Sequence, residues 1–216
     1  MGNKWNVQKQ GGFTLVNLAG LVVSSGIAFG VAVQGVDYVG NLEKENFYKD
    51  LTQLESHLWA HREIRHVWPG DCDGNGVISY HPDRVSNPES VRIIANSQLP
   101  ASCRNSAEES ITATFDALRQ MGIVDAETTN FKLSQHRQNG HFQVGHGVPN
   151  GKPANVVVAY NVSVDVARWV DETVDGQVDG GQGRVRRWDE KDAGSDWDQT
   201  YDGLVTLAYY FERKIK

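Results

Sequence analysis

Three oxygen-bearing side chains alternate along a short, glycine-containing segment in the first half of the chain. Asp71, Asp73 and Asn75 stand two residues apart, and Gly76 follows them. Alternate side chains of such a tight loop converge, and carboxylate, amide and carbonyl oxygens are the ligands that Ca²⁺ prefers. The spacing therefore predicts a candidate calcium site, with the carbonyl oxygen of Val77 as a further ligand.

The segment DCDGNGVIS, residues 71–79, resembles the first half of EF-hand and dockerin loops. The match has oxygens at positions one, three and five, glycine at six and an apolar residue at eight. At position twelve the resemblance implies a bidentate glutamate, but the residue is Pro82. Asp83 is next and supplies a carboxylate if the loop is one residue longer. The alternative is an acidic, glycine-rich turn that binds no metal.

The histidines show no comparable metal-binding pattern. His57 and His61 lie four residues apart, but no HExxH glutamate or third ligand accompanies them. We expect a solvated or partly packed helix face there, and scattered surface histidines at His136, His141 and His146. The sequence contains no GxSxG, phosphate-binding loop, dinucleotide fingerprint or catalytic carboxylate pair. These observations favour a protein that is not an enzyme.

Charge is distributed very unevenly along the chain. The 216 residues carry a net charge of -6, yet residues 10–36 contain no charged side chain. As a helix, residues 13–36 would span roughly 36 Å, enough for the ~30 Å hydrocarbon core of a bilayer. Lys4 and Lys9 precede this segment, and Asp37, Glu43 and Glu45 follow it. The positive-inside rule then predicts a cytoplasmic N-terminus and a translocated remainder.

The residues at the start of this segment, KQGGFTLVNL at positions 9–18, resemble the cleavage motif of type IV prepilins and type II secretion pseudopilins. Those precursors carry a short basic leader ending in glycine, and then a mature phenylalanine that opens a long hydrophobic helix. The resemblance implies cleavage between Gly12 and Phe13 by prepilin peptidase, followed by N-methylation of Phe13. An ordinary signal peptide has a shorter apolar core, and an uncleaved membrane anchor remains the alternative.

One residue departs from the family pattern. The fifth mature residue in most members is a glutamate that pairs with the N-terminal amine of a neighbouring subunit, and here it is Asn17. An amide still forms hydrogen bonds but loses the charge-assisted part of this assembly contact. Because the family includes minor subunits without this glutamate, Asn17 favours a minor over a major subunit.

The chain has two cysteines, Cys72 and Cys103. A translocated domain lies in an oxidising compartment, where an even pair normally forms a disulfide. We therefore predict a Cys72–Cys103 bond that ties the candidate calcium loop to the head; two reduced core cysteines are the alternative.

The secondary structure is expected to begin with one long helix, from about residue 13 to about residue 66. Apolar residues recur at helical spacing through Leu51, Leu54 and Leu58, and Pro69 with Gly70 ends the pattern. A second helix is expected at residues 106–120 and a third at 164–174. Strands are expected at residues 144–148, 155–162, 184–188 and 204–212.

This layout predicts an α+β, pilin-like fold, in which the long helix packs on a head with an antiparallel β-sheet. The β-branched run at residues 155–162 is expected in the centre of the sheet. Asp171, Asp175 and Asp179 are expected at a solvated helix end and hairpin, or alternatively around a second cation. The tryptophans of the head are expected in core or rim packing.

The predicted organisation is a leader at residues 1–12, a transmembrane and polymerisation half-helix at 13–36, an amphipathic half-helix at 37–68 and a head at 69–216. The resemblance implies a minor pilin or pseudopilin, anchored by a single inner-membrane span with its head in the periplasm. It would then enter a periplasmic or extracellular filament. Its expected partners are other subunits, prepilin peptidase and, before assembly, the inner membrane. The net negative charge argues against nucleic acid as a binding partner. The alternative is a non-polymerising, membrane-anchored periplasmic module that binds calcium or another ligand.

Overall fold

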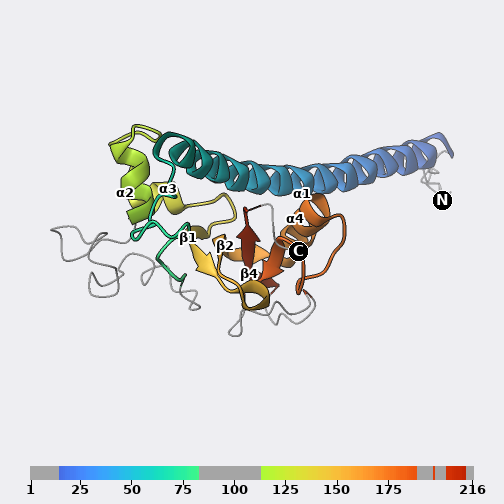
Figure 1. Cartoon of the computed structure of the whole chain (residues 1–216). Helices are drawn as coiled ribbons and strands as arrows, with labels where there is room; N and C mark the ends of the chain where they lie inside the picture. The colour runs from blue at the N-terminus through green and yellow to red at the C-terminus, as the bar shows by residue number, and fades with distance from the viewer. Residues whose placement is uncertain (1–14, 83–112, 189–196, 198–202, 213–216) are drawn as a thin grey trace, which may run out of the picture. The chain divides into compact units, whose positions relative to one another are not determined.

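The computed structural model describes residues 15–82, 113–188, 197 and 203–212, and within the first helix the side chains are described from Gly40 onward. The chain divides into two compact units, Met1–Leu42 and Glu43–Lys216. The first unit contains the beginning of helix α1, Leu15–Arg65, and the second contains the remainder of that helix and a β-sheet (Figure 1).

The sheet has four antiparallel strands in the order β1-β2-β4-β3. Their bounds are His141–Gly147 for β1, Ala154–Ser163 for β2, Val185–Arg187 for β3 and Leu204–Tyr210 for β4. Strand β2 pairs with β1 on one side and β4 on the other. This confirms the predicted α+β composition, the antiparallel sheet and the central place of the β-branched strand.

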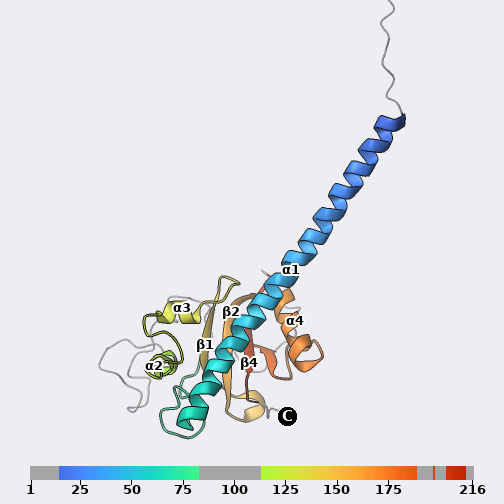
Figure 2. The ribbon, with the colours of Figure 1, turned by 90° about the horizontal axis from the view of Figure 1, so that it is seen from above.

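The second part of α1 packs on one face of the sheet (Figure 2). Phe47, Leu51 and Leu58 are fully buried, and Leu54 is 6% exposed. These residues recur every three or four positions, so they share one side of the helix. They form a single core with apolar side chains of the sheet and of the other helices.

A second apolar cluster lies on the opposite face of the sheet. It contains alternate residues of β2 and β4, together with Trp188. Strand β2 is therefore buried on both faces, which is why its sequence is a near-continuous apolar run rather than an alternating one.

Three shorter helices complete the described fold: α2 at Ala113–Gln120, α3 at Asn130–Ser134 and α4 at Val164–Asp175, with a 3-10 turn at Pro149–Gly151. The Ser163 side chain caps the start of α4 by accepting from the Val166 N–H, and Gly176 ends the helix with a φ of 75°. The sequence predicted α4 to within one residue. It did not predict α3, whose five residues are too few to show a helical period.

The membrane prediction concerns residues that precede the described side chains. From Gly40 onward, no helix in the described residues is long and apolar enough to cross a bilayer.

Candidate functional site

The candidate calcium loop begins where α1 ends. His66 has a φ of 62°, and its N–H donates to the Arg62 carbonyl at 2.7 Å, which closes the last turn of the helix. Gly70 then takes a φ of 86°, and a β-carbon there would lie 2.6 Å from the Thr114 hydroxyl oxygen. Thr114 donates to the Pro69 carbonyl at 3.1 Å. The entry to the loop is therefore fixed against α2, and only glycine fits at position 70.

Side-chain oxygens shape the loop itself. Asp71 accepts from the Gly74 N–H at 2.8 Å with one carboxylate oxygen and from the Gly76 N–H at 2.9 Å with the other. Asp73 accepts from the Asn75 N–H at 3.3 Å, and Asn75 accepts from the Val77 N–H at 2.7 Å. Each of the three predicted side-chain ligands therefore stabilises one of the successive turns, as Asx residues do.

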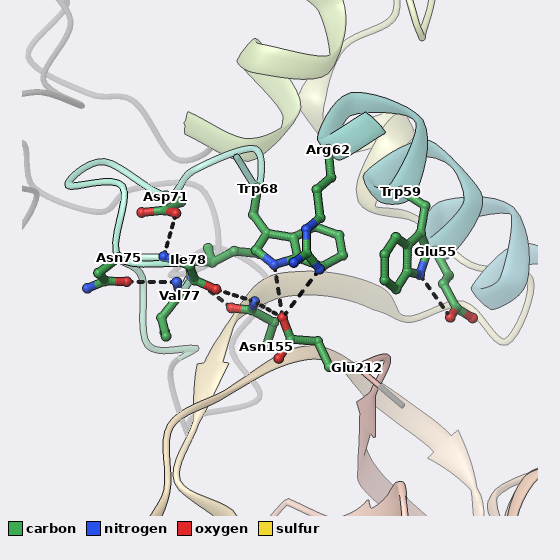
Figure 3. Close-up of polar contacts among 11 residues, drawn as sticks. Glu55, Trp59, Arg62, Trp68, Asp71, Asn75, Val77, Ile78, Asn155 and Glu212 are labelled. Carbon is green, nitrogen blue, oxygen red and sulfur yellow. Dashed lines mark hydrogen bonds and ion pairs between the residues drawn. The ribbon is translucent and has the colours of Figure 1, made fainter. Parts of the chain in front are cut away.

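The loop is attached to the sheet by Asn155, a fully buried residue of β2 (Figure 3). The Asn155 side-chain oxygen accepts from the Ile78 N–H at 2.7 Å, and its amide nitrogen donates to the Gly76 carbonyl at 3.0 Å. The same nitrogen donates to Glu212 at 2.8 Å. Because a buried amide must find partners, the asparagine that opens the β-branched run was a usable signal that our sequence reasoning missed.

Glu212 links this anchor to the end of α1. Besides Asn155, its carboxylate accepts from the Trp68 indole N–H at 2.9 Å and lies 4.0 Å from the Arg62 guanidinium. Arg62 in turn lies over the Trp68 ring at 4.3 Å and the Trp59 ring at 5.2 Å. Figure 3 shows this chain of contacts running from the loop to the helix. Hydrogen bonds, an ion pair and cation–π contacts therefore connect the loop, β2 and the end of α1.

A second polar cluster fixes α1 about two turns before Arg62. Glu55 accepts from the Tyr209 hydroxyl at 2.5 Å and lies 3.6 Å from the Arg184 guanidinium. Burial raises the pKa of Tyr209, and the neighbouring Glu55 raises it further, so the phenol stays protonated and donates. A shallow groove of about 780 Å³ runs along this side of α1, with Trp59 between Glu55 and Arg62.

The exit of the loop runs along the free edge of β1. The His146 N–H donates to the Tyr80 carbonyl at 2.8 Å, and the His146 ring donates to the Ile78 carbonyl at 2.7 Å. His81 donates back to the His146 carbonyl at 2.8 Å. The loop therefore contacts the sheet twice, through Asn155 in its centre and through His146 at its edge.

The expectation of scattered surface histidines is wrong. His136 is 2% exposed, and its ring donates to the Tyr160 carbonyl at 2.8 Å while accepting from the Gln138 N–H. Burial lowers the pKa of His136 to about 4, so this ring is neutral at physiological pH. His141 is also buried and stacks on Tyr160, with ring centroids 4.7 Å apart. His57 is half-buried and His61 is 6% exposed, in line with a partly packed helix face.

The acidic residues at the end of α4 and just after it also differ from expectation, because Asp171 is only 1% exposed rather than solvated. Its carboxylate accepts from the Trp197 indole at 2.8 Å and from the Asp179 N–H at 2.7 Å. Burial raises the pKa of Asp171 to about 6, although these two hydrogen bonds oppose the rise. Asp175 accepts from the N–H groups of Arg184 and Val185, both at 2.8 Å. These carboxylates hold the turn between α4 and β3.

The donor set of the loop suits a hard cation in type, because every candidate ligand is an oxygen. Three of the predicted ligand side chains, Asp71, Asp73 and Asn75, lie in the loop, while Pro82 is buried and Asp83 lies outside the described residues. Among the described residues, no three His, Cys, Asp or Glu side chains gather closely enough to hold a metal ion. Calcium binding therefore stays a prediction.

The other predicted site residues lie partly outside the described chain. Cys72 is disulfide-bonded, but Cys103 lies outside the described residues, so the pairing stays a prediction. Gly12 and Phe13 also lie outside them, and Asn17 falls within α1 ahead of the described side chains. Comparison of the chain with family models, with curated proteins and with solved structures finds no match.

Proposed function

We propose that this chain is a minor pilin or pseudopilin, a structural subunit of a type IV pilus-like or type II secretion filament. The observation that carries the proposal is the Gly12–Phe13 junction, with lysines before it and an uncharged run after it. Helix α1 begins at Leu15 and continues without interruption to Arg65. A cleavage motif that leads directly into one long helix is what a filament subunit requires.

The arrangement of the second unit supports this proposal. Residues 43–65 of α1 bury Phe47, Leu51 and Leu58 against the sheet, so this part of the helix is an integral part of the head's core. Residues 13–36 are uncharged and rich in glycine and small residues, which suits a helix that exchanges lipid contacts for contacts with neighbouring helices. The function is assembly, and we propose no catalytic role.

The cellular route follows from the same residues. The precursor crosses the inner membrane once, with its head in the periplasm, and prepilin peptidase removes residues 1–12. The mature chain is methylated at Phe13 and joins other subunits in a periplasmic or extracellular filament. Asn17 provides a neutral amide in place of the usual glutamate, which favours a minor over a major subunit. Calcium bound by the loop, through Asp71, Asp73, Asn75, Val77 and Asp83, would order the region that follows the long helix.

The mass of the chain purified from its native host tests the proposal. We expect the wild-type chain to lack residues 1–12 and to carry one additional methyl group. Replacing the glycine at the junction, Gly12→Val, should leave the full-length mass, because the side chain blocks close approach of the extended backbone to the peptidase. The matched control is Gly2→Val, the same substitution far from the junction, which should be cleaved like the wild type.

The competing function is a membrane-anchored periplasmic module that binds calcium or another ligand and never polymerises. This module needs the apolar segment but not the junction. A wild-type chain that keeps its leader, and a Gly12→Val variant with unchanged mass and location, would favour it and exclude the filament proposal.

A further inference from the structure

A small cavity lies where α1, α2, α3 and β1 meet. Its volume is about 160 Å³, close to that of engineered cavities that accept one benzene ring. Both views of the ribbon place α2 and α3 beside α1 (Figures 1 and 2). The cavity lies in the second unit, on a different side of α1 from the groove at Trp59.

The floor of the cavity is apolar. It is formed by Leu54 of α1, Phe115 and Leu118 of α2, Val124, and Phe142 of β1. Each of these side chains is at most 8% exposed. An apolar group of suitable size would therefore replace empty space with dispersion contacts on several sides.

The rim carries one negative charge, and that charge is already paired. The carboxylate of Asp50 accepts from the Arg137 N–H at 3.2 Å and lies 3.4 Å from the Arg137 guanidinium. Asp50 therefore presents little unbalanced negative charge to the cavity, and a cationic ligand has no free partner there.

The remaining polar groups of the rim are free. In the described part of the chain, the side chains of Gln53, His57, Lys132 and Gln135 make no hydrogen bond or ion pair. Burial lowers the pKa of His57, so its imidazole is neutral at physiological pH. The ammonium group of Lys132 is thus the uncompensated charge of the lining.

We propose that this cavity binds a small monocarboxylate with a single-ring or branched aliphatic body. The apolar body lies on the floor formed by Leu54, Leu118 and Phe142. The carboxylate lies at the rim, where it pairs with Lys132 and accepts hydrogen bonds from the neighbouring amides. The site does not depend on cleavage at Gly12 or on filament assembly, so the two proposals stand or fall separately.

Methyl NMR of the full chain in lipid nanodiscs tests this site, with phenylacetate as the probe. Saturable shifts are expected at the methyl groups of Leu54, Leu118 and Val124, which report contact with the floor. The neutral isostere phenylacetamide should bind about threefold to fivefold more weakly, because a partly exposed ion pair contributes modestly.

Two variants separate the rim from the floor. Lys132→Gln should reduce phenylacetate affinity to that of phenylacetamide, whereas the control Lys152→Gln, an exposed lysine outside the cavity, should not. Val124→Phe fills the floor and should abolish the shifts, while the methyl groups of Val157 in the sheet report that the head remains folded. Absence of saturation at millimolar phenylacetate, equal affinity for the two probes, or equal losses in the two lysine variants would overturn the proposal.

Discussion

The side chain of Asn155 is fully buried. Its amide forms hydrogen bonds with two backbone groups of the loop and with the carboxylate of Glu212. Replacing it with an apolar residue of similar size, Asn155→Val, leaves the Ile78 N–H and the Gly76 carbonyl without partners. We expect the free energy of unfolding to fall by about 2–4 kcal/mol, because unpaired buried polar groups incur the desolvation cost.

Chemical denaturation measures this loss, and hydrogen exchange at the Ile78 amide localises it. The control is Gln177→Val, an amide on the exposed turn after α4, which should change stability by less than about 0.5 kcal/mol. Similar stability of the Asn155→Val variant and the wild type would show that the loop does not depend on this anchor.

The loop carboxylates yield a direct calcium test. If Ca²⁺ binds only the folded state, stability in excess Ca²⁺ should exceed that in chelator by about 3 kcal/mol at a hundredfold excess over the dissociation constant. Asp73→Ala should remove the response with little other effect, because Asp73 is exposed and, among the described residues, its carboxylate forms hydrogen bonds only with Asn75.

Asp125 offers a matched control for Asp73. It is also exposed, and its carboxylate also accepts the N–H two residues later, from Glu127 at 3.0 Å. The Asp125→Ala variant should keep the calcium response. Equal melting temperatures of the wild type in chelator and in millimolar Ca²⁺ would contradict calcium binding.

The buried carboxyl group of Asp171 predicts a pH effect. Burial raises its pKa from 3.8 in the reference state to about 6 in the fold, so the fold favours the protonated form. The protonated Asp171 side chain therefore contributes to the free energy of unfolding below about pH 4. This contribution is lost as the pH rises through about 6 and the carboxyl group ionises.

The free energy of unfolding of the Asp171→Asn variant, relative to that of the wild type, should therefore increase as the pH rises. We expect an increase of about 2–3 kcal/mol between pH 4 and 7. Denaturation series at several pH values measure this difference. The control is Glu172→Gln, which removes a carboxylate from the exposed neighbouring position. A constant difference for Asp171→Asn would mean that the carboxyl group titrates normally.

At the scale of elements, the second part of α1 contributes to the core through one stripe of apolar residues. Leu58 is fully buried on this stripe, whereas Ile64 on another side of the helix is 58% exposed. Leu58→Ala should cost about 2–5 kcal/mol of unfolding free energy through lost contacts and a residual cavity. Ile64→Ala should cost far less. Comparable losses in thermal or chemical denaturation would show that the helix does not pack through this stripe.

Elements with a clear hydrophobic pattern were predictable from the sequence. The β-branched run became β2, and the segment predicted as a third helix became α4. The contacts between elements were not predictable, because they depend on three-dimensional proximity. His136 and Asp171 are polar, yet both are buried, and each has a hydrogen-bond partner more than 20 residues away in the chain, Tyr160 and Trp197 respectively. For the candidate site, the sequence indicated the loop and its candidate oxygen ligands but not Asn155 and Glu212, which attach the loop to the sheet.

At the scale of the whole molecule, the net charge of -6 belongs to the full 216-residue sequence. Removal of residues 1–12 takes away Lys4 and Lys9, so the side-chain charge of the proposed mature chain becomes -8. All of its charged side chains follow the uncharged segment. The proposed mature chain would therefore consist of two parts that differ in charge, a neutral polymerisation helix and an acidic, solvent-facing head.

Two of the polar contacts that fix α1 and the segment after it come from the far end of the chain. Trp68 is 144 residues from Glu212, and Glu55 is 154 residues from Tyr209. During synthesis α1 emerges long before β4, so these contacts form only when the chain is nearly complete. Such long-range closure slows folding. For a chain proposed to pass its head through a membrane, these two contacts cannot form until β4 and Glu212 have crossed.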